Sequence, residues 1–171
     1  ASKNRTKNGY LLFHPDLETI ISERKRMERE LSRMISEESS EIWMQPVLKL
    51  SDASLFALEV LSRWFHPELG EIPPAEFIRI AEEPKLIDRL DRSVIRRSCA
   101  RLAALRLDHP DLHLLINVSA LTLLEADFSA FIGEQLRLHA IPDGALMLEV
   151  TETVLASDEA LLLKNISAIR E

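Results

Sequence analysis

The order of apolar segments from residue 41 onward constrains the fold of this chain more than any other feature. Two strand-like runs, "EIWMQPVLKL" and "LFALEVLSRWF", flank the turn "SDAS" and predict a β-hairpin. After the hairpin, helical patterns alternate with two further strand-like runs, "LHLLINVS" and "ALMLEVTET". Strands that are separated by helices pair in parallel through right-handed crossovers. The sequence therefore predicts an α/β domain whose sheet becomes parallel after the hairpin.

Proline and small polar residues mark the expected helix boundaries. Pro74 suits the first turn of a helix, and Pro84 is expected to divide the long helical stretch that follows into two. The stretch "LTLLEADFSAFIGEQLRLHA" is mostly helical in pattern. A last helix, in "SDEALLLKNISAIRE", is expected to be capped by Ser157 or Asp158.

Residues 14–40 are predicted to form an amphipathic linker helix. Pro15 and Asp16 suit a helix start. The apolar residues recur at helical spacing: Ile20, Met27, Leu31, Met34 and Ile35. Glu and Arg dominate the rest of the segment, which is typical of a coiled-coil-like linker. A solvated helix that packs once against its own domain fits the same pattern equally well.

The composition excludes several classes of protein. A length of 171 residues is enough for one domain, or one domain and a fragment, and the net charge of −7 argues against binding to duplex DNA or RNA. The only cysteine, Cys99, permits no disulfide framework, so a reducing cytoplasm is the expected location. No apolar run approaches the roughly 18 residues of a membrane span, although an anchor elsewhere in a longer parent protein stays open. With four glycines and no glycine-rich phosphate loop, P-loop and Rossmann folds are excluded.

Three predicted strands carry a polar side chain at or near the carboxyl end: Glu59, Asn117 and Glu149. In a barrel of parallel strands, that end is where sites assemble from different strands. Two carboxylates and an amide oxygen are hard ligands that suit Mg²⁺ or Mn²⁺. Arg63 lies four residues after Glu59, so both side chains project from one face of the strand, and the guanidinium could bind a phosphate there.

Each of these residues also has an ordinary structural interpretation. An acid at a strand end is commonly a cap or an ion-pair partner, and Arg63 could simply pair with Glu59. Asn117 could serve only to begin a loop. Spacing alone leaves the metal site and these alternatives open.

Several motifs together resemble the EAL domain, the bacterial cyclic-di-GMP phosphodiesterase domain. They are "WMQPVLKL", "LFALEVLSRWFHPELGEIPPAEFIRIAEE", "LLINVSA" and "LMLEVTET", in the family's order. The Glu-Ala-Leu that names the family stands here as Glu59-Val60-Leu61. The resemblance covers residues 41–171, interpreted as the N-terminal half of an EAL domain. Residues 1–13 look like the C-terminal tail of a GGDEF domain, which a helix such as that of residues 14–40 joins to the EAL domain in tandem proteins.

The resemblance implies a TIM-like (β/α) barrel with an antiparallel first strand, of which only the N-terminal half is present. It implies that Glu59, Asn117 and Glu149 bind Mg²⁺ or Mn²⁺, and that Gln45 and Arg63 contact the dinucleotide. Glu152 matches the second acid of the family's Glu-x-x-Glu motif, which steadies a loop of the active site and so counts with Glu59 among the catalytic residues. In the family's reaction, two metal ions activate a water that attacks one phosphodiester of cyclic-di-GMP and leaves linear pGpG.

Two short motifs depart from the family pattern. Leu121 and Thr122 stand where the family often has Arg-Gln, and "EEPKLI" replaces "EETGLI". Both changes are expected near the rim of the ligand site, where they would weaken binding. The family's Asp-Asp-Phe-Gly motif, its catalytic Lys and a later Glu are expected to follow Glu171, so the 171 residues alone are predicted to be inactive.

Three functions remain on these grounds. The first is the cyclic-di-GMP phosphodiesterase of a complete protein that also carries an upstream GGDEF domain. The second is a catalytically silent EAL-type module that senses cyclic-di-GMP or binds a protein. The third is a structural half-barrel that associates with a copy of itself, and an unfinished sheet makes a homodimer the expected assembly of this chain.

Overall fold

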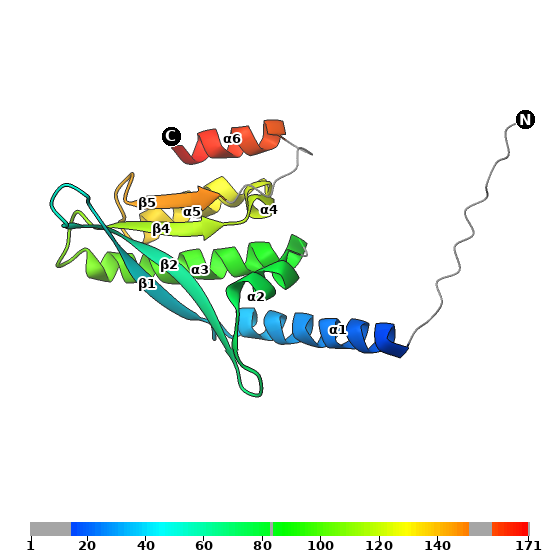
Figure 1. Ribbon diagram of the computed structural model, residues 1–171. Helices are drawn as coiled ribbons and strands as arrows, with labels where there is room; N and C mark the ends of the chain where they lie inside the picture. Colours follow the sequence, from blue (N-terminus) through cyan, green and yellow to red (C-terminus); the bar gives the residue numbers. More distant parts are fainter. Residues whose placement is uncertain (1–14, 83, 151–158, 171) are drawn as a thin grey trace, which may run out of the picture.

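A computed structural model describes residues 15–82, 84–150 and 159–170 of the chain. Helices and strands alternate along most of this length (Figure 1). The elements are α1 (Pro15–Ser36), β1 (Glu41–Leu48), β2 (Leu55–His66), β3 (Gly70–Ile72), α2 (Pro74–Ala81), α3 (Pro84–Leu105), β4 (His113–Val118), α4 (Ala120–Leu123), α5 (Phe128–Leu138), β5 (Leu146–Val150) and α6 (Glu159–Arg170).

The strands form one mixed sheet in the order β1-β2-β4-β5, with the short β3 paired to β2. β1 and β2 are antiparallel, whereas the β2–β4 and β4–β5 pairs are parallel. The predicted hairpin, the parallel strands after it and the α/β class are thereby confirmed. Within the described residues the sheet stays open, with β1 at one edge and β5 at the other.

The sequence pattern did not predict β3. It begins at Gly70, whose φ of +74° allows the tight turn after β2, and it pairs with the end of β2 from Trp64 to His66. A three-residue strand is too short for a period of two to be recognised. Its pairing extends β2 into a second hairpin, which projects below the sheet in Figure 1.

Helices cover one face of the sheet. In β4 the side chains of Leu114, Ile116 and Val118 are buried, while those of Leu115 and Asn117 between them are more exposed. Because side chains alternate across a strand, the buried set faces the helices and the other set faces away from them. The helices α2, α3 and α5 lie on the covered side (Figure 1). The core therefore sits between this side of the sheet and the helices.

The predicted helix boundaries around the prolines are confirmed. α2 begins at Pro74, and α3 begins at Pro84. The stretch after β4 divides into α4 and α5, and Ser119 caps α4 by accepting a hydrogen bond from the N–H of Leu121 at 3.2 Å. The predicted caps of α6 at Ser157 and Asp158 lie outside the described residues.

The last turns of α1 belong to the core of the domain. Leu31, Met34 and Ile35 are buried there, at 0%, 3% and 5% exposure, and α1 packs against α2 and α3. The amino-terminal turns of α1 extend away from the other elements (Figure 1). The helix ends at Ser36, four residues before the predicted end of the linker. This arrangement supports the interpretation in which the helix packs on its own domain.

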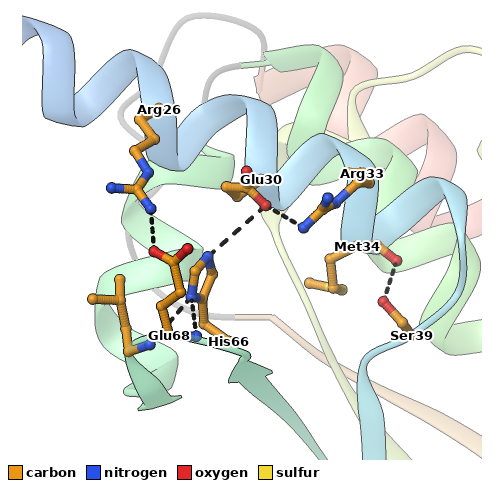
Figure 2. A network of polar contacts seen from close by, with 8 residues as sticks. Arg26, Glu30, Arg33, Met34, Ser39, His66 and Glu68 are labelled. Carbon is orange, nitrogen blue, oxygen red and sulfur yellow. Dashed lines mark hydrogen bonds and ion pairs between the residues drawn. The ribbon is translucent and has the colours of Figure 1, made fainter.

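Polar contacts fasten α1 to the turn between β2 and β3 (Figure 2). Arg26 of α1 pairs with Glu68 at 2.5 Å, and Glu30 lies 3.8 Å from Nε2 of His66. His66 is buried, and its Nδ1 accepts hydrogen bonds from the backbone N–H groups of Glu68 and Leu69 at 3.1 and 3.2 Å. His66 therefore holds the turn in shape while Arg26 and Glu30 join it to the helix.

Two expectations from composition concern Cys99 and the membrane. Cys99 lies on α3 with no exposed surface, and burial raises the pKa of its thiol to about 11. At neutral pH it is a protonated core residue rather than a reactive thiolate. Across residues 15–82, 84–150 and 159–170, the structure contains no helix with the length and apolarity required to cross a membrane.

Candidate functional site

The structure places the predicted site residues on the face of the sheet that the helices leave uncovered. Gln45 on β1 lies directly opposite Glu59 on β2 in the antiparallel register. Asn117 on β4 lies beside Glu149 on β5 in the parallel register. Partners in register project to the same face of a sheet. Side chains from four strands are thus gathered in one row across the sheet.

A hydrogen bond joins the two halves of this row. Leu115 is the register partner of Glu59, and Asn117 stands two residues further along β4 on the same face. From there Asn117 donates from Nδ2 to Oε1 of Glu59 at 3.2 Å. When the side-chain amide of Asn117 flips, its NH₂ group and its oxygen exchange places, and the amide oxygen then lies next to the Glu59 carboxylate. Glu59, Asn117 and Glu149 are therefore adjacent, although Glu59 lies in the first half of β2 and not at its carboxyl end as expected.

Arg63 lies on the same face as Glu59, closer to the carboxyl end of β2. Among the described residues its ion-pair partner is Glu71 of β3, with Nε 3.6 Å from Oε1, and not Glu59. Its guanidinium carbon also lies 5.3 Å from the centre of the Trp43 ring, a cation–π distance. Nη1 donates to the carbonyl oxygen of Ser62 at 3.1 Å. The alternative interpretation of Arg63 as the partner of Glu59 is thereby corrected, because the β2–β3 hairpin supplies a different acid.

Trp43 and Glu71 belong to the site but were not singled out from the sequence. Trp43 is two residues before Gln45 on β1, half exposed, and its Nε1 donates to Oε2 of Glu41 at 2.9 Å. The period of two along β1 was the available signal, because it places Trp43 and Gln45 on one face. Glu71 carried no signal, since its approach to Arg63 depends on the unpredicted strand β3.

The donor atoms suit a hard divalent cation. Glu59, Asn117 and Glu149 offer carboxylate and amide oxygens, which are the preferred ligands of Mg²⁺ and Mn²⁺. In the part of the chain that the structure describes, no three His, Cys, Asp or Glu side chains cluster as a metal site. Among the described residues there is therefore no candidate zinc site built from histidine and cysteine. The proposed set of oxygen ligands is not among such clusters of His, Cys, Asp or Glu, because one of its three members is an asparagine. Glu152, the predicted loop-steadying acid, lies outside the described residues.

Comparison with known proteins agrees with this geometry. The sequence matches the EAL domain family over residues 28–171. The chain belongs to the EAL domain family. The match begins within α1, consistent with the burial of the last turns of that helix in the core.

Two similar curated proteins come from Pseudomonas aeruginosa. The cyclic di-GMP phosphodiesterase NbdA is 32% identical over 99% of this chain and 22% of the relative. The bifunctional diguanylate cyclase/cyclic di-GMP phosphodiesterase MucR is 27% identical over 98% of this chain and 25% of the relative. The EAL chain thus spans between a fifth and a quarter of the length of these curated relatives.

Solved structures of EAL domains share the fold. The MucR phosphodiesterase in complex with c-di-GMP aligns with a TM-score of 0.73 at 28% identity, over 84% of this chain and 60% of that one. The EAL enzyme Bd1971, in a form bound to cAMP and cyclic-di-GMP, aligns with a TM-score of 0.79 at 22% identity. That alignment covers 88% of this chain and 42% of Bd1971. The predicted EAL-type fold is confirmed, and in each case the chain corresponds to only part of the solved molecule.

Proposed function

We propose that the intact protein containing this EAL region is a metal-dependent phosphodiesterase that hydrolyses cyclic-di-GMP to linear pGpG. The observation that carries the proposal is the row of Gln45, Glu59, Asn117 and Glu149 across four neighbouring strands of an EAL fold. The relatives NbdA and MucR are named as cyclic di-GMP phosphodiesterases, and the MucR domain is solved with c-di-GMP. Family and geometry therefore support the same substrate.

The proposal assigns the predicted site residues to metal binding, substrate binding and loop positioning. Glu59, Asn117 and Glu149 would hold Mg²⁺ or Mn²⁺, which supplies an activated water and charge stabilisation for phosphodiester hydrolysis when bound. The guanidinium of Arg63 presents paired N–H donors for a phosphate of the dinucleotide. Gln45, opposite Glu59, offers an amide that can donate and accept hydrogen bonds to the same ligand. Glu152 would steady a loop of the active site, as its match to the second acid of the family's Glu-x-x-Glu motif implies.

A catalytically silent sensor is the second candidate. The observation that favours it is Leu121, which is 37% exposed on α4, four residues after Asn117. With Thr122 it replaces the Arg-Gln pair common in the family: Leu121 has no side-chain donor, and the hydroxyl of Thr122 is buried and donates to Asp91 instead of a ligand. Such a module would bind cyclic-di-GMP or a protein without hydrolysing the nucleotide.

The substitution Glu59→Gln in the intact protein tests the proposed phosphodiesterase. It removes one ligand charge and keeps the side-chain volume, so we expect hydrolysis of cyclic-di-GMP to be lost with little change in thermal stability. Product pGpG would be followed chromatographically at millimolar Mg²⁺ or Mn²⁺. Glu76→Gln, an exposed acid on α2, serves as the matched control. Full activity in Glu59→Gln would reject the metal assignment, and binding without turnover by the wild-type protein would favour the sensor.

A further inference from the structure

Asp91 is a buried acid that the proposed reaction does not use. It stands on α3 at helical spacing from the core residues Ile87 and Val94, and it is only 8% exposed. Burial raises the pKa of its carboxyl group to about 7, despite hydrogen bonds from Thr122 and Ser119 that act in the opposite direction. Burying an acid on the apolar face of a helix costs free energy unless hydrogen bonds compensate for its lost contact with water. The donors of these hydrogen bonds indicate which part of the fold Asp91 holds in place.

Both donors to Asp91 lie in the segment that follows β4. Oδ2 accepts a hydrogen bond from the backbone N–H of Ser119 at 3.0 Å and another from Oγ1 of Thr122 at 2.6 Å. The N–H of Thr122 in turn donates to the carbonyl oxygen of Ser119 at 3.1 Å. One carboxylate oxygen on α3 therefore holds the first and last residues of the turn by which β4 enters α4.

This turn sets the direction in which β4 leaves the sheet at the candidate metal site. Asn117 is two residues before Ser119, and Val118 between them is buried on the opposite face. Asn117 reaches Glu59 across the β2–β4 pair through a single hydrogen bond of 3.2 Å. A small displacement of Ser119 would therefore move the Asn117 amide relative to the Glu59 and Glu149 carboxylates.

We propose that Asp91 is a positioning residue for the divalent-metal site: by tying Ser119 and Thr122 to α3, it orients Asn117 as a ligand. This inference rests on the proposed function, because it assigns Asn117 to a metal. It goes beyond that function by naming a residue on the far side of the sheet from the ligands. Groups that orient ligands without touching the metal commonly change metal affinity by about 10–100-fold when they are removed.

A purely structural role for Asp91 makes a different prediction. If its hydrogen bonds only stabilised the core, their loss would lower the unfolding temperature and leave the metal affinity of the folded protein unchanged. A positioning role requires the affinity to fall in protein that is still folded. Binding of Mn²⁺, measured well below the unfolding temperature, therefore separates the two roles without depending on turnover.

The experiment compares variants of the intact protein by calorimetric titration with Mn²⁺ alone. Asp91→Ala removes both hydrogen bonds, and we expect its Kd for Mn²⁺ to rise by about tenfold or more. Asp91→Asn keeps an oxygen that can accept from Ser119 and Thr122, so we expect its affinity to stay within about threefold of wild type. The matched control is Asp88→Asn, on the same helix, where the acid pairs instead with Arg92 at 2.6 Å. We expect wild-type affinity in this control.

Thr122→Val covers the case in which Asp91→Ala does not fold. The substitution keeps the shape of the side chain and removes only the hydroxyl donor, so we expect a smaller rise in Kd in the same direction. Wild-type Mn²⁺ affinity in folded Asp91→Ala, or in Thr122→Val if the former does not fold, would overturn the positioning role alone. Wild-type Mn²⁺ affinity in Glu59→Gln would instead overturn the proposed metal site, and the positioning role with it.

Discussion

At the scale of single residues, two neighbours hold Arg63, the proposed phosphate contact, in place. Its side chain is only 20% exposed, and its guanidinium contacts both the Trp43 ring and the Glu71 carboxylate. Both contacts restrict a side chain that would otherwise lose much conformational entropy on binding. The site therefore suits the planar guanidinium of arginine, with its paired N–H donors, better than the flexible ammonium group of lysine.

Arg63→Lys is expected to weaken cyclic-di-GMP binding by about tenfold and to leave Mn²⁺ affinity unchanged. Lysine keeps the positive charge but loses the second parallel donor and the flat surface that stacks on Trp43. A tenfold loss corresponds to about 1.4 kcal/mol, close to the lower limit of about 1.5 kcal/mol for one hydrogen bond to a charged group. Calorimetry with a non-hydrolysable phosphorothioate analogue measures binding without turnover. Arg101→Lys on the exposed side of α3 is the control, and equal affinity in both variants would show that Arg63 serves only Glu71.

The sequence indicated the residues of the candidate metal site but not the residues that contact their neighbours. Glu59, Asn117 and Glu149 were singled out because each was expected near the end of an apolar strand. In the structure Glu59 lies in the first half of β2, but the alternation of side chains still places it on the same face as the other two. The contact of Arg63 with Glu71 was not predictable, because it depends on a hairpin with a three-residue strand. Asp91 was overlooked although it interrupts the apolar face of α3. Its partners are 28 and 31 residues away, and no local pattern relates them.

At the scale of elements, α1 shows what an amphipathic sequence pattern leaves open. An amphipathic pattern states that a helix has an apolar face, but it does not state what covers that face. The segment of residues 14–40 was therefore open to two interpretations, a linker or a packed helix. Burial of Leu31, Met34 and Ile35 and the contacts of Arg26 and Glu30 with the β2–β3 turn identify the last turns of α1 as part of the domain.

Leu31→Ala tests this assignment of α1. Leu31 has no exposed surface, so truncation should leave a cavity and lower the free energy of unfolding by about 2–5 kcal/mol. Ile21→Ala on the same helix removes a side chain that is 46% exposed, and we expect a change within about 0.5 kcal/mol. Urea unfolding followed by the fluorescence of Trp64, which is buried in the same core, measures both. A Leu31→Ala variant as stable as Ile21→Ala would mean that α1 is an independent linker.

At the scale of the whole molecule, the described residues leave one face and two edges of the sheet uncovered. Trp43 on this face is 50% exposed although it is a large apolar residue, and its register partner Leu61 is only partly buried. Parallel strands are normally buried on both faces, and an open strand edge offers unpaired N–H and carbonyl groups. At about 25 cal/mol per Å², a few hundred Å² of wet apolar surface corresponds to several kcal/mol. That is comparable with the whole stability of a domain, about 5–15 kcal/mol.

Residues 1–171 expressed alone are therefore expected to associate through the uncovered face at micromolar concentration. Sedimentation velocity over a range of concentrations measures the association. Leu61→Lys places a charge on that face, opposite Trp43, at a position that is already partly exposed, so it should shift the chain toward monomer without costing much stability. Leu107→Lys, at a position that is 85% exposed in the turn after α3, is the matched control and should leave association unchanged. A wild-type chain that stays monomeric and unfolds cooperatively would contradict the argument, because it would show that the open sheet is stable without a second layer.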